Sequence, residues 1–236
     1  MQVSELLERL SYGELSNLAI SNNGNGTIIE AQQPKIISYT NEGLLRLYSR
    51  YVLEESDVLV QLYDSITLYN LLPAFAVHYV PGSEEFSEPI RYLLDTADAP
   101  FKDEVIRITT LFDNYGQHIP LNDEERHDSC FSPQVKVLQV PDPISDKVIT
   151  VRYQKRHSKL NGELTQIITC PDVLLGALTS YIAYKVYSHM NSVESNAKAQ
   201  EFNANFEQIC NEVMDRDLVS SSVSQTNTRF ARGGWR

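Results

Sequence analysis

PKIISYTNEGLLRLYSRYVLEESDVLVQLYD, residues 34–64, contains the change of hydrophobic period on which the fold class depends. In its first part the apolar residues recur every three or four positions. This spacing predicts a helix over Pro34–Tyr51, with the proline in the first turn, where its missing N–H is tolerated. From Asp57 to Tyr63 the apolar residues alternate instead, as in a half-buried strand. A helix followed directly by a strand indicates a mixed fold.

The segments around this stretch add a short helix and several turns. Ser4, Glu5 and a leucine stripe ending at Leu10 predict a helix with a serine cap and an acid in its first turn. Ser21–Gly26 has a turn residue at almost every position. The apolar run Leu68–Val77 contains a proline, so it is compatible with a strand end, a short buried helix or a broken one.

The middle of the chain is typical of a small antiparallel β domain. Short β-like runs at Val105–Phe112, Gln134–Val140 and Val148–Tyr153 are separated by turn residues. Beyond Pro171 the period returns to that of a helix, and a polar break near Asn191 divides it in two. These last segments predict an α-hairpin.

The predicted fold class is α+β: a helical bundle built from both chain ends, with an inserted small antiparallel β domain and an extended C-terminal tail. Each terminal group of helices is too short to bury a core alone, so we expect them to share one. The boundaries are 1–80 for the N-terminal helical part, 81–157 for the β domain, 158–217 for the α-hairpin that completes the bundle, and 218–236 for the tail.

Charge and cysteine content exclude some function classes. The 236 residues contain 31 acidic and 20 basic side chains, a net charge of −11, which argues against static binding to nucleic acid or to an anionic membrane. No apolar run approaches the ~20 residues of a membrane span, and no signal peptide is visible. Cys130, Cys170 and Cys210 form no CxxC pair, so we expect free thiols in a reducing cytoplasm.

No constellation of residues predicts catalysis, a metal site or a cofactor. Gly24-Asn25-Gly26 lacks the lysine and hydroxyl residue of a phosphate-binding loop and is interpreted as a turn. The acidic cluster at residues 118–128 has neither the order of a calcium loop nor that of a zinc helix, and a solvated hairpin explains it. His127 and Cys130 are close in sequence but lack the surroundings of a thiol protease. Ser180, Ser188 and His189 lack a nucleophile elbow.

Aromatic residues at helical spacing are the first candidates for contacts. They lie among aliphatic residues with few flanking cations, which favours helix–helix and subunit contacts over nucleic-acid stacking. These candidates are Tyr48, Tyr51, Tyr181, Tyr184 and Tyr187.

The C-terminal end is the second candidate for a contact. Residues 216–236 hold four arginines and one aspartate, a local charge of +3, which leaves −14 for the rest of the chain. Aromatic and arginine side chains on a flexible tether are typical of interface hot spots, so we predict docking on a partner rather than a merely disordered terminus. The docking residues would be Arg229, Phe230, Arg232, Trp235 and Arg236.

Seven segments spread over nearly the whole chain together resemble one protein family. They are VSELLERLSYGELSNLAI (3–20), PKIISYTNEGLLRLYSRYVL (34–53), VLVQLYD (58–64), PLND (120–123), ITVRYQKRH (149–157), PDVLLGALTSYIAYKVYSHM (171–190) and RFARGGWR (229–236). The chain resembles the head-to-tail adaptor, or connector, proteins of short-tailed bacteriophages. None of these segments is catalytic.

The resemblance implies a structural virion protein at the head–tail junction, assembled in the host cytoplasm. It implies a homo-oligomeric, twelve-fold ring that joins the portal protein to the tail nozzle protein, with no membrane involved. Its C-terminal extension would dock on the portal through the five tail residues named above. Double-stranded DNA would pass through the lumen without sequence-specific binding, and acidic walls would repel its phosphates.

Two other readings stay open. One is a module that binds a carbohydrate or a peptide on the β domain, which a concave aromatic site there would favour. The other is a hydrolase that uses Cys130 with His127.

Overall fold

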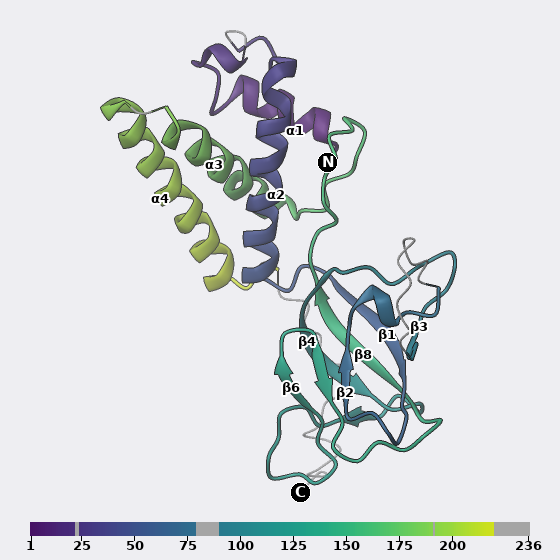
Figure 1. Ribbon diagram of the computed structural model, residues 1–236. Coiled ribbons are helices and arrows are strands. Elements are labelled where there is room, and N and C mark those ends of the chain that lie inside the picture. Colours follow the sequence, from purple (N-terminus) through teal and green to yellow (C-terminus); the bar gives the residue numbers. More distant parts are fainter. Residues whose placement is uncertain (22–23, 79–89, 191, 220–236) are drawn as a thin grey trace, which may run out of the picture.

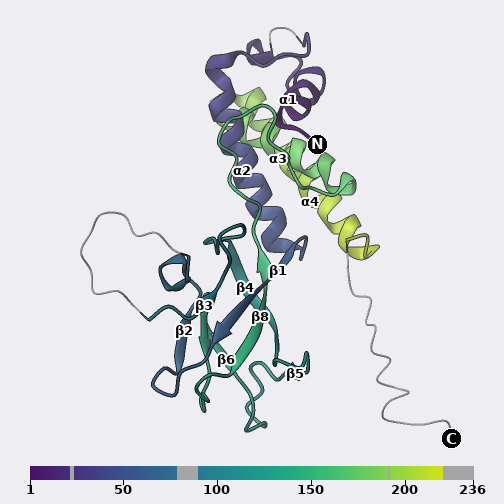
Figure 2. The same cartoon turned by 90° about the vertical axis from the view of Figure 1, so that its right-hand side faces the viewer.

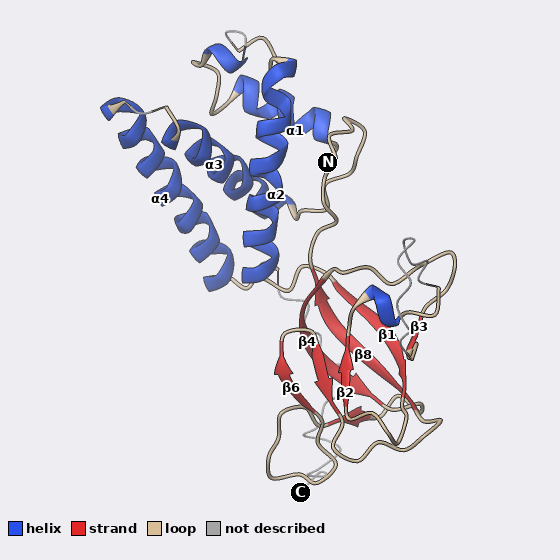
Figure 3. Cartoon of the chain, in the orientation of Figure 1, coloured by secondary structure: helices blue, strands red, loops and turns tan. Residues whose placement is uncertain are grey.

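The computed structural model describes residues 1–21, 24–78, 90–190 and 192–219. In these ranges the chain forms four helices, α1 (Val3–Tyr12), α2 (Gln33–Arg50), α3 (Asp172–Ser188) and α4 (Val193–Asp215). It also forms eight strands: β1 (Glu55–Gln61), β2 (Leu68–Asn70), β3 (Leu93–Leu94), β4 (Val105–Phe112), β5 (His118–Ile119), β6 (Phe131–Gln134), β7 (Val137–Gln139) and β8 (Val148–Lys155). The mixed α and β class is therefore confirmed, with the helices at one end of the molecule and the strands at the other (Figure 3).

The hydrophobic period locates most elements correctly. The predicted change from helix to strand is confirmed by α2 and β1, and the two helices beyond Pro171 are confirmed by α3 and α4. The open segment Leu68–Val77 contains β2 and then a single 3₁₀ turn at Pro73–Phe75. Proline accounts for this ending, because it fixes its own φ and cannot donate to a strand ladder.

Two local predictions were wrong. The cap of α1 is Gln2 rather than Ser4, because Gln2 is extended and bridges to Ile167 in the segment that precedes α3. The N–H of Val3, the first helical residue, donates to Gln166 O of the same segment at 3.0 Å. The predicted run Gln134–Val140 is two strands, since Gln134 pairs with Val137 across a hairpin. The first turn of α1 does carry its predicted acid, and the carboxylate of Glu5 accepts from Gln2 N–H at 2.9 Å.

The strands form two antiparallel sheets. The larger has the order β3-β1-β8-β4-β5 and the smaller the order β2-β7-β6. In the larger sheet β8 pairs with β1 along its length, with Val58 opposite Val151. β1 and β2 precede residue 80, so the sheets begin inside the segment expected to belong to the helical part.

Two separate hydrophobic cores follow from this arrangement. One gathers the apolar faces of all four helices, from Leu6 near the start of the chain to Phe206 near the end of α4. The other fills the space between the sheets around Leu111 and Val151. In Figure 1 the purple-to-blue helices of the first part of the chain lie beside the green and yellow helices of the last part.

The chain crosses between helices and sheets twice in the described residues, first from α2 to β1 and later from β8 to α3. The second crossing, residues 156–171, is called here the connecting segment. Figure 2 shows it leaving β8, running along α2 toward α1 and then entering α3. It pairs with the start of the chain on the way, and Ile168 N–H donates to Met1 O at 2.8 Å.

Candidate functional site

The tyrosines predicted from helical spacing are mostly core residues. Tyr48, Tyr51, Tyr181 and Tyr187 are each no more than 7% exposed, and only Tyr184 is half-buried. The prediction named contacts between helices and contacts between subunits. For the four buried rings the structure shows contacts within the helical core. Their burial within this chain removes them as surface contacts to another subunit, which leaves Tyr184.

The two tyrosines at the end of α2 also bind distant backbone. Tyr48 Oη donates to Thr169 O at 2.5 Å, and Tyr51 Oη donates to Cys210 O at 2.6 Å. Burial raises the pKa of Tyr51 to about 12, so the hydroxyl remains a donor at neutral pH. These two bonds tie the last turn of α2 to the connecting segment and to α4.

The tyrosines of α3 pack against α4. The ring of Tyr181 lies 5.4 Å from that of Phe206, and Tyr187 stacks on Phe202 at 5.5 Å between centroids. Tyr184 lines a shallow surface hollow between α3 and α4, together with small and amide side chains such as Ala204 and Asn196. An aromatic ring bordered by small residues is typical of a contact surface.

The five tail residues, Arg229, Phe230, Arg232, Trp235 and Arg236, lie outside the described residues. The docking function assigned to them from the sequence therefore stays a prediction.

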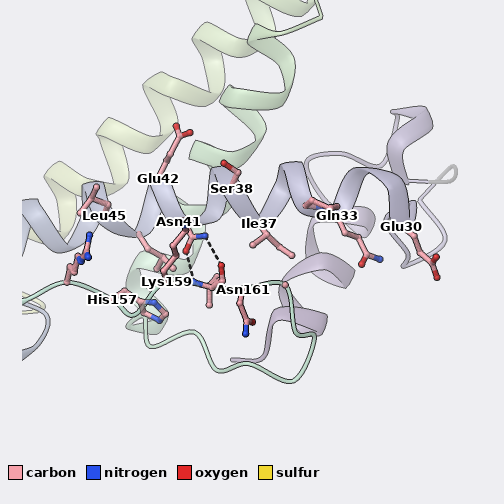
Figure 4. Close-up of a pocket in the computed structure, with 15 residues that line it drawn as sticks. Glu30, Gln33, Ile37, Ser38, Asn41, Glu42, Leu45, His157, Lys159 and Asn161 are labelled. Carbon is pink, nitrogen blue, oxygen red and sulfur yellow. Dashed lines mark hydrogen bonds between the residues drawn. The ribbon is translucent and has the colours of Figure 1, made fainter. Parts of the chain in front are cut away.

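A groove along α2 was not predicted from the sequence. It has a volume of about 820 Å³ and lies between the exposed face of α2 and the start of the connecting segment (Figure 4). Leu45, 47% exposed, contributes an apolar side chain, while Arg156 and Lys159 contribute cations from the opposite wall. We refer to it as the α2 groove.

One amide side chain holds the two walls of the α2 groove together. Asn41 Nδ2 donates to Leu160 O at 3.1 Å, and Leu160 N–H donates to Asn41 Oδ1 at 2.8 Å. These are the two dashed bonds of Figure 4. This paired bond reproduces one rung of a β-ladder, so it fixes the connecting segment on the helix although the segment has no periodic pattern.

His157 also lines the α2 groove, beside the start of the connecting segment (Figure 4). Its Nε2 accepts from Thr169 N–H at 3.0 Å, so the proton lies on Nδ1, which donates to Ser158 O at 2.6 Å. Burial lowers the pKa of this imidazole, against the opposing effect of Glu54 and Glu104. The neutral imidazole of His157 therefore links the two ends of the connecting segment through its bond to Thr169.

The junction between the two cores is polar and buried. Gln154 at the end of β8 is 1% exposed, and its Nε2 donates to the backbone oxygens of Tyr48 and Tyr51. Next to it, Lys155 Nζ lies 2.9 Å from a carboxylate oxygen of Glu54. Buried polar bonds of this kind are directional, so they define one orientation of α2 on the sheet.

Cys130 and His127 do not form an activated pair. Cys130 is buried, which raises the pKa of its thiol to about 11, whereas His127 is exposed. Only a thiolate is a competent nucleophile, and a thiol of this pKa is almost entirely protonated at neutral pH. The burial of Cys130 therefore disfavours the cysteine hydrolase.

The open face of the larger sheet carries a shallow hollow around Phe112. The guanidinium of Arg152 lies 5.1 Å from the centroid of this ring and forms a two-bond ion pair with Asp57, at 2.8 and 2.9 Å. The cation therefore occupies one face of the Phe112 ring, a face on which a sugar could otherwise stack. This hollow therefore lacks the open aromatic surface that a carbohydrate module would need there.

The described residues add two negative findings. None of the described helices combines the length and the apolar character needed to cross a bilayer. Within the same ranges, His, Cys, Asp and Glu nowhere gather in threes that could hold a metal ion.

Two comparisons of the sequence, with protein families and with curated proteins, find no relative. No protein-family model matches the chain. A search of curated proteins also returns no match.

Proposed function

We propose that this protein is a structural head-to-tail adaptor of a short-tailed bacteriophage. It forms a ring, twelve-fold in the family it resembles, that joins the portal to the tail nozzle and lets DNA pass through its lumen. It acts at the head–tail junction of the virion after assembly in the host cytoplasm, and it is not an enzyme.

The observation that carries the proposal is the pairing of two cores in one chain. The helical core draws residues from both ends of the sequence, such as Leu6 and Phe206, and the strands that form the second core lie between them. The resemblance implies a helical bundle with an inserted β domain, and two cores ordered in this way along the chain support it. Such a molecule offers different surfaces at its two ends, which suits a protein that joins two different partners.

The charge distribution supports the same function. Residues 1–215 carry a net charge of −14, and residues 216–236 carry +3. An acidic body repels the DNA phosphates that pass it, while a basic and aromatic tail suits docking on another protein.

The proposal is tested by mixing the full-length protein with the portal ring of the same phage. Native mass spectrometry should show several adaptor copies on each portal. The double variant Phe230→Ala/Trp235→Ala should bind at least about tenfold more weakly, because hot-spot aromatic side chains each contribute roughly 2 kcal/mol or more.

The matched control is Tyr115→Ala, which removes an aromatic ring that is 81% exposed in the loop after β4. This variant should bind as the wild type does. Absence of any complex with the wild-type protein would refute the adaptor function, and equal binding by the tail variant would place the anchor elsewhere.

A further inference from the structure

The outer face of α4 carries a stripe of carboxylates. Positions 194, 201, 208 and 215 lie seven residues apart and therefore on one side of a helix. Position 208 is a glutamine, and Glu212, one turn after it, lies on the same side. The carboxylates on this side, called here the acidic stripe, are Glu194, Glu201, Glu212 and Asp215. All are exposed, because the buried residues of α4, such as Phe206 and Cys210, occupy the opposite side.

The α2 groove presents two cations, and within the described ranges neither forms an ion pair with a carboxylate of this chain. Lys159 is exposed on the connecting segment. The guanidinium of Arg156 donates to the backbone oxygen of Asp103, at 2.6 Å, and a neutral carbonyl does not cancel its charge. In a body of net charge −14, adjacent cations on one wall of a groove suit an anionic surface.

The groove and the stripe lie on opposite sides of the helical part. In Figure 1, α4 is at the left edge, while the connecting segment runs to the right of α2. A closed ring needs this arrangement, since each subunit contacts one neighbour with one face and the next neighbour with a different face.

The α2 groove and the acidic stripe also lie at corresponding heights along the helix axes. α2 and α4 run in the same direction, because Arg46 binds Glu207 at 2.8 Å and Arg50 binds Asn211 at 2.6 Å. Lys159, next to the Leu160 that Asn41 holds, is therefore near the level of Glu201, and Leu45 is near that of Ala204. Neighbours related by rotation about an axis parallel to these helices would bring the matching levels together.

We propose that the α2 groove binds the acidic stripe of a second copy of this chain. Lys159 and Arg156 of one copy pair with Glu201 and Glu212 of the next, and Leu45 packs against the small Ala204. This inference rests on the proposed ring and names the contact between its subunits.

The test exchanges charges in the full-length protein. Lys159→Glu alone and Glu201→Lys alone should each weaken self-association by about tenfold or more, because each opposes like charges at every contact of a ring. Sedimentation velocity over a concentration series, with and without the portal ring, measures this loss. The double variant, in which the pair is reversed, should associate as the wild type does.

Mixing the two single variants gives the sharpest outcome. The groove of the Lys159→Glu copy meets the stripe of the Glu201→Lys copy with opposite charges, and the reverse contact is wild type. An equimolar mixture should therefore assemble in alternation although each variant alone does not, and native mass spectrometry should count equal numbers of both. Recovery on mixing also shows that the variants are folded.

The matched controls are Lys102→Glu and Glu124→Lys, which change the same charges at exposed positions of the β part. They should leave association unchanged. If the wild type forms multimers and the two single variants do so equally well, this contact is refuted while the ring stands. The same conclusion follows if neither the double variant nor the mixture of single variants restores assembly. If the wild type forms no multimer alone or on the portal, the ring itself is refuted and the contact with it.

Discussion

Gly43 shows how one residue sets the distance between two helices. A Cβ at this position would lie 2.9 Å from Leu178 Cδ1 and 2.9 Å from Tyr181 Cδ1, closer than such atoms normally approach. α2 and α3 pack at this point because the position has no side chain. The glycine lowers helix propensity by roughly 1 kcal/mol relative to alanine, and close packing offsets that cost.

We expect Gly43→Ala to destabilise the protein by about 1–2 kcal/mol. The clash costs roughly 1–3 kcal/mol, and the gain in helix propensity recovers part of it. Gly176→Ala is the matched control on α3, since its Cβ would lie 3.4 Å from Ile209 Cδ1, where contact is ordinary. Urea unfolding should show a lower midpoint for the first variant and an equal or higher one for the second.

Asn41 is the corresponding polar case. Asn41→Ala removes both bonds to the backbone of Leu160, and the free energy of unfolding should fall by about 1–3 kcal/mol. The amide of Leu160 should also exchange its hydrogen faster, which NMR can follow directly. Ser38→Ala, an exposed position one turn earlier, should change neither quantity. Unaltered exchange at Leu160 in Asn41→Ala would contradict the role of Asn41 as the clamp of this segment.

At the scale of elements, a repeating pattern decides what the sequence can predict. α2, β1 and β8 were predictable, because each buries one face and its apolar residues repeat with the matching period. The connecting segment was not predictable. It is held by single contacts to residues far away in sequence, such as Asn41 and Tyr48, and no local pattern records such contacts.

The connecting segment gives the protein a predictable response to acid. His157 accepts from Thr169 N–H, which only the neutral ring can do, and its pKa is lowered by burial. The unfolded chain therefore binds more protons than the folded one near and below pH ~6.5, the ordinary pKa of histidine. The contribution of His157 to stability is complete above that pH and is lost as pH falls through the lowered value.

Urea unfolding at pH 7.5, 6.5 and 5.5 checks this prediction. The wild type should lose stability over this range, and His157→Gln, which does not titrate, should lose less. His127→Gln, at an exposed histidine, should follow the wild-type slope. A slope for His157→Gln as steep as that of the wild type would assign the acid response to other groups.

At the scale of the whole molecule, two cores in one chain predict two regions of independent stability. Phe206→Ala should destabilise the helices by about 3–5 kcal/mol, because the ring is fully buried against Tyr181. Leu111→Ala should destabilise the sheets by about 2–5 kcal/mol. Amide hydrogen exchange should show faster opening in α3 and α4 for the first variant and in β4 and β8 for the second. Equal acceleration throughout the molecule in both variants would show one cooperative unit instead.

Some of the candidate contact surfaces could be predicted from the sequence and others could not, as was the case for the elements of the fold. Helical spacing located four of the five tyrosines correctly on helices, while Tyr51 is the extended residue that follows α2. A repeat cannot distinguish the inner face of a helix from the outer one, and four of the five side chains are buried. The α2 groove needed the folded chain, because its walls come from residues more than 100 positions apart. The tail prediction depends on composition alone.

The helical core also has a consequence for the order of events during synthesis. Leu10 of α1 is fully buried in the finished protein, in the same core as Leu174 of α3, which the ribosome adds 164 residues later. At ~5–20 residues per second, the apolar face of α1 remains without its final partners for roughly 10–30 s. By then the last strand, β8, has already been made, so the sheets are complete first. The nascent chain thus carries a complete β part and an N-terminal helix with an exposed apolar face. A chaperone would bind such a species.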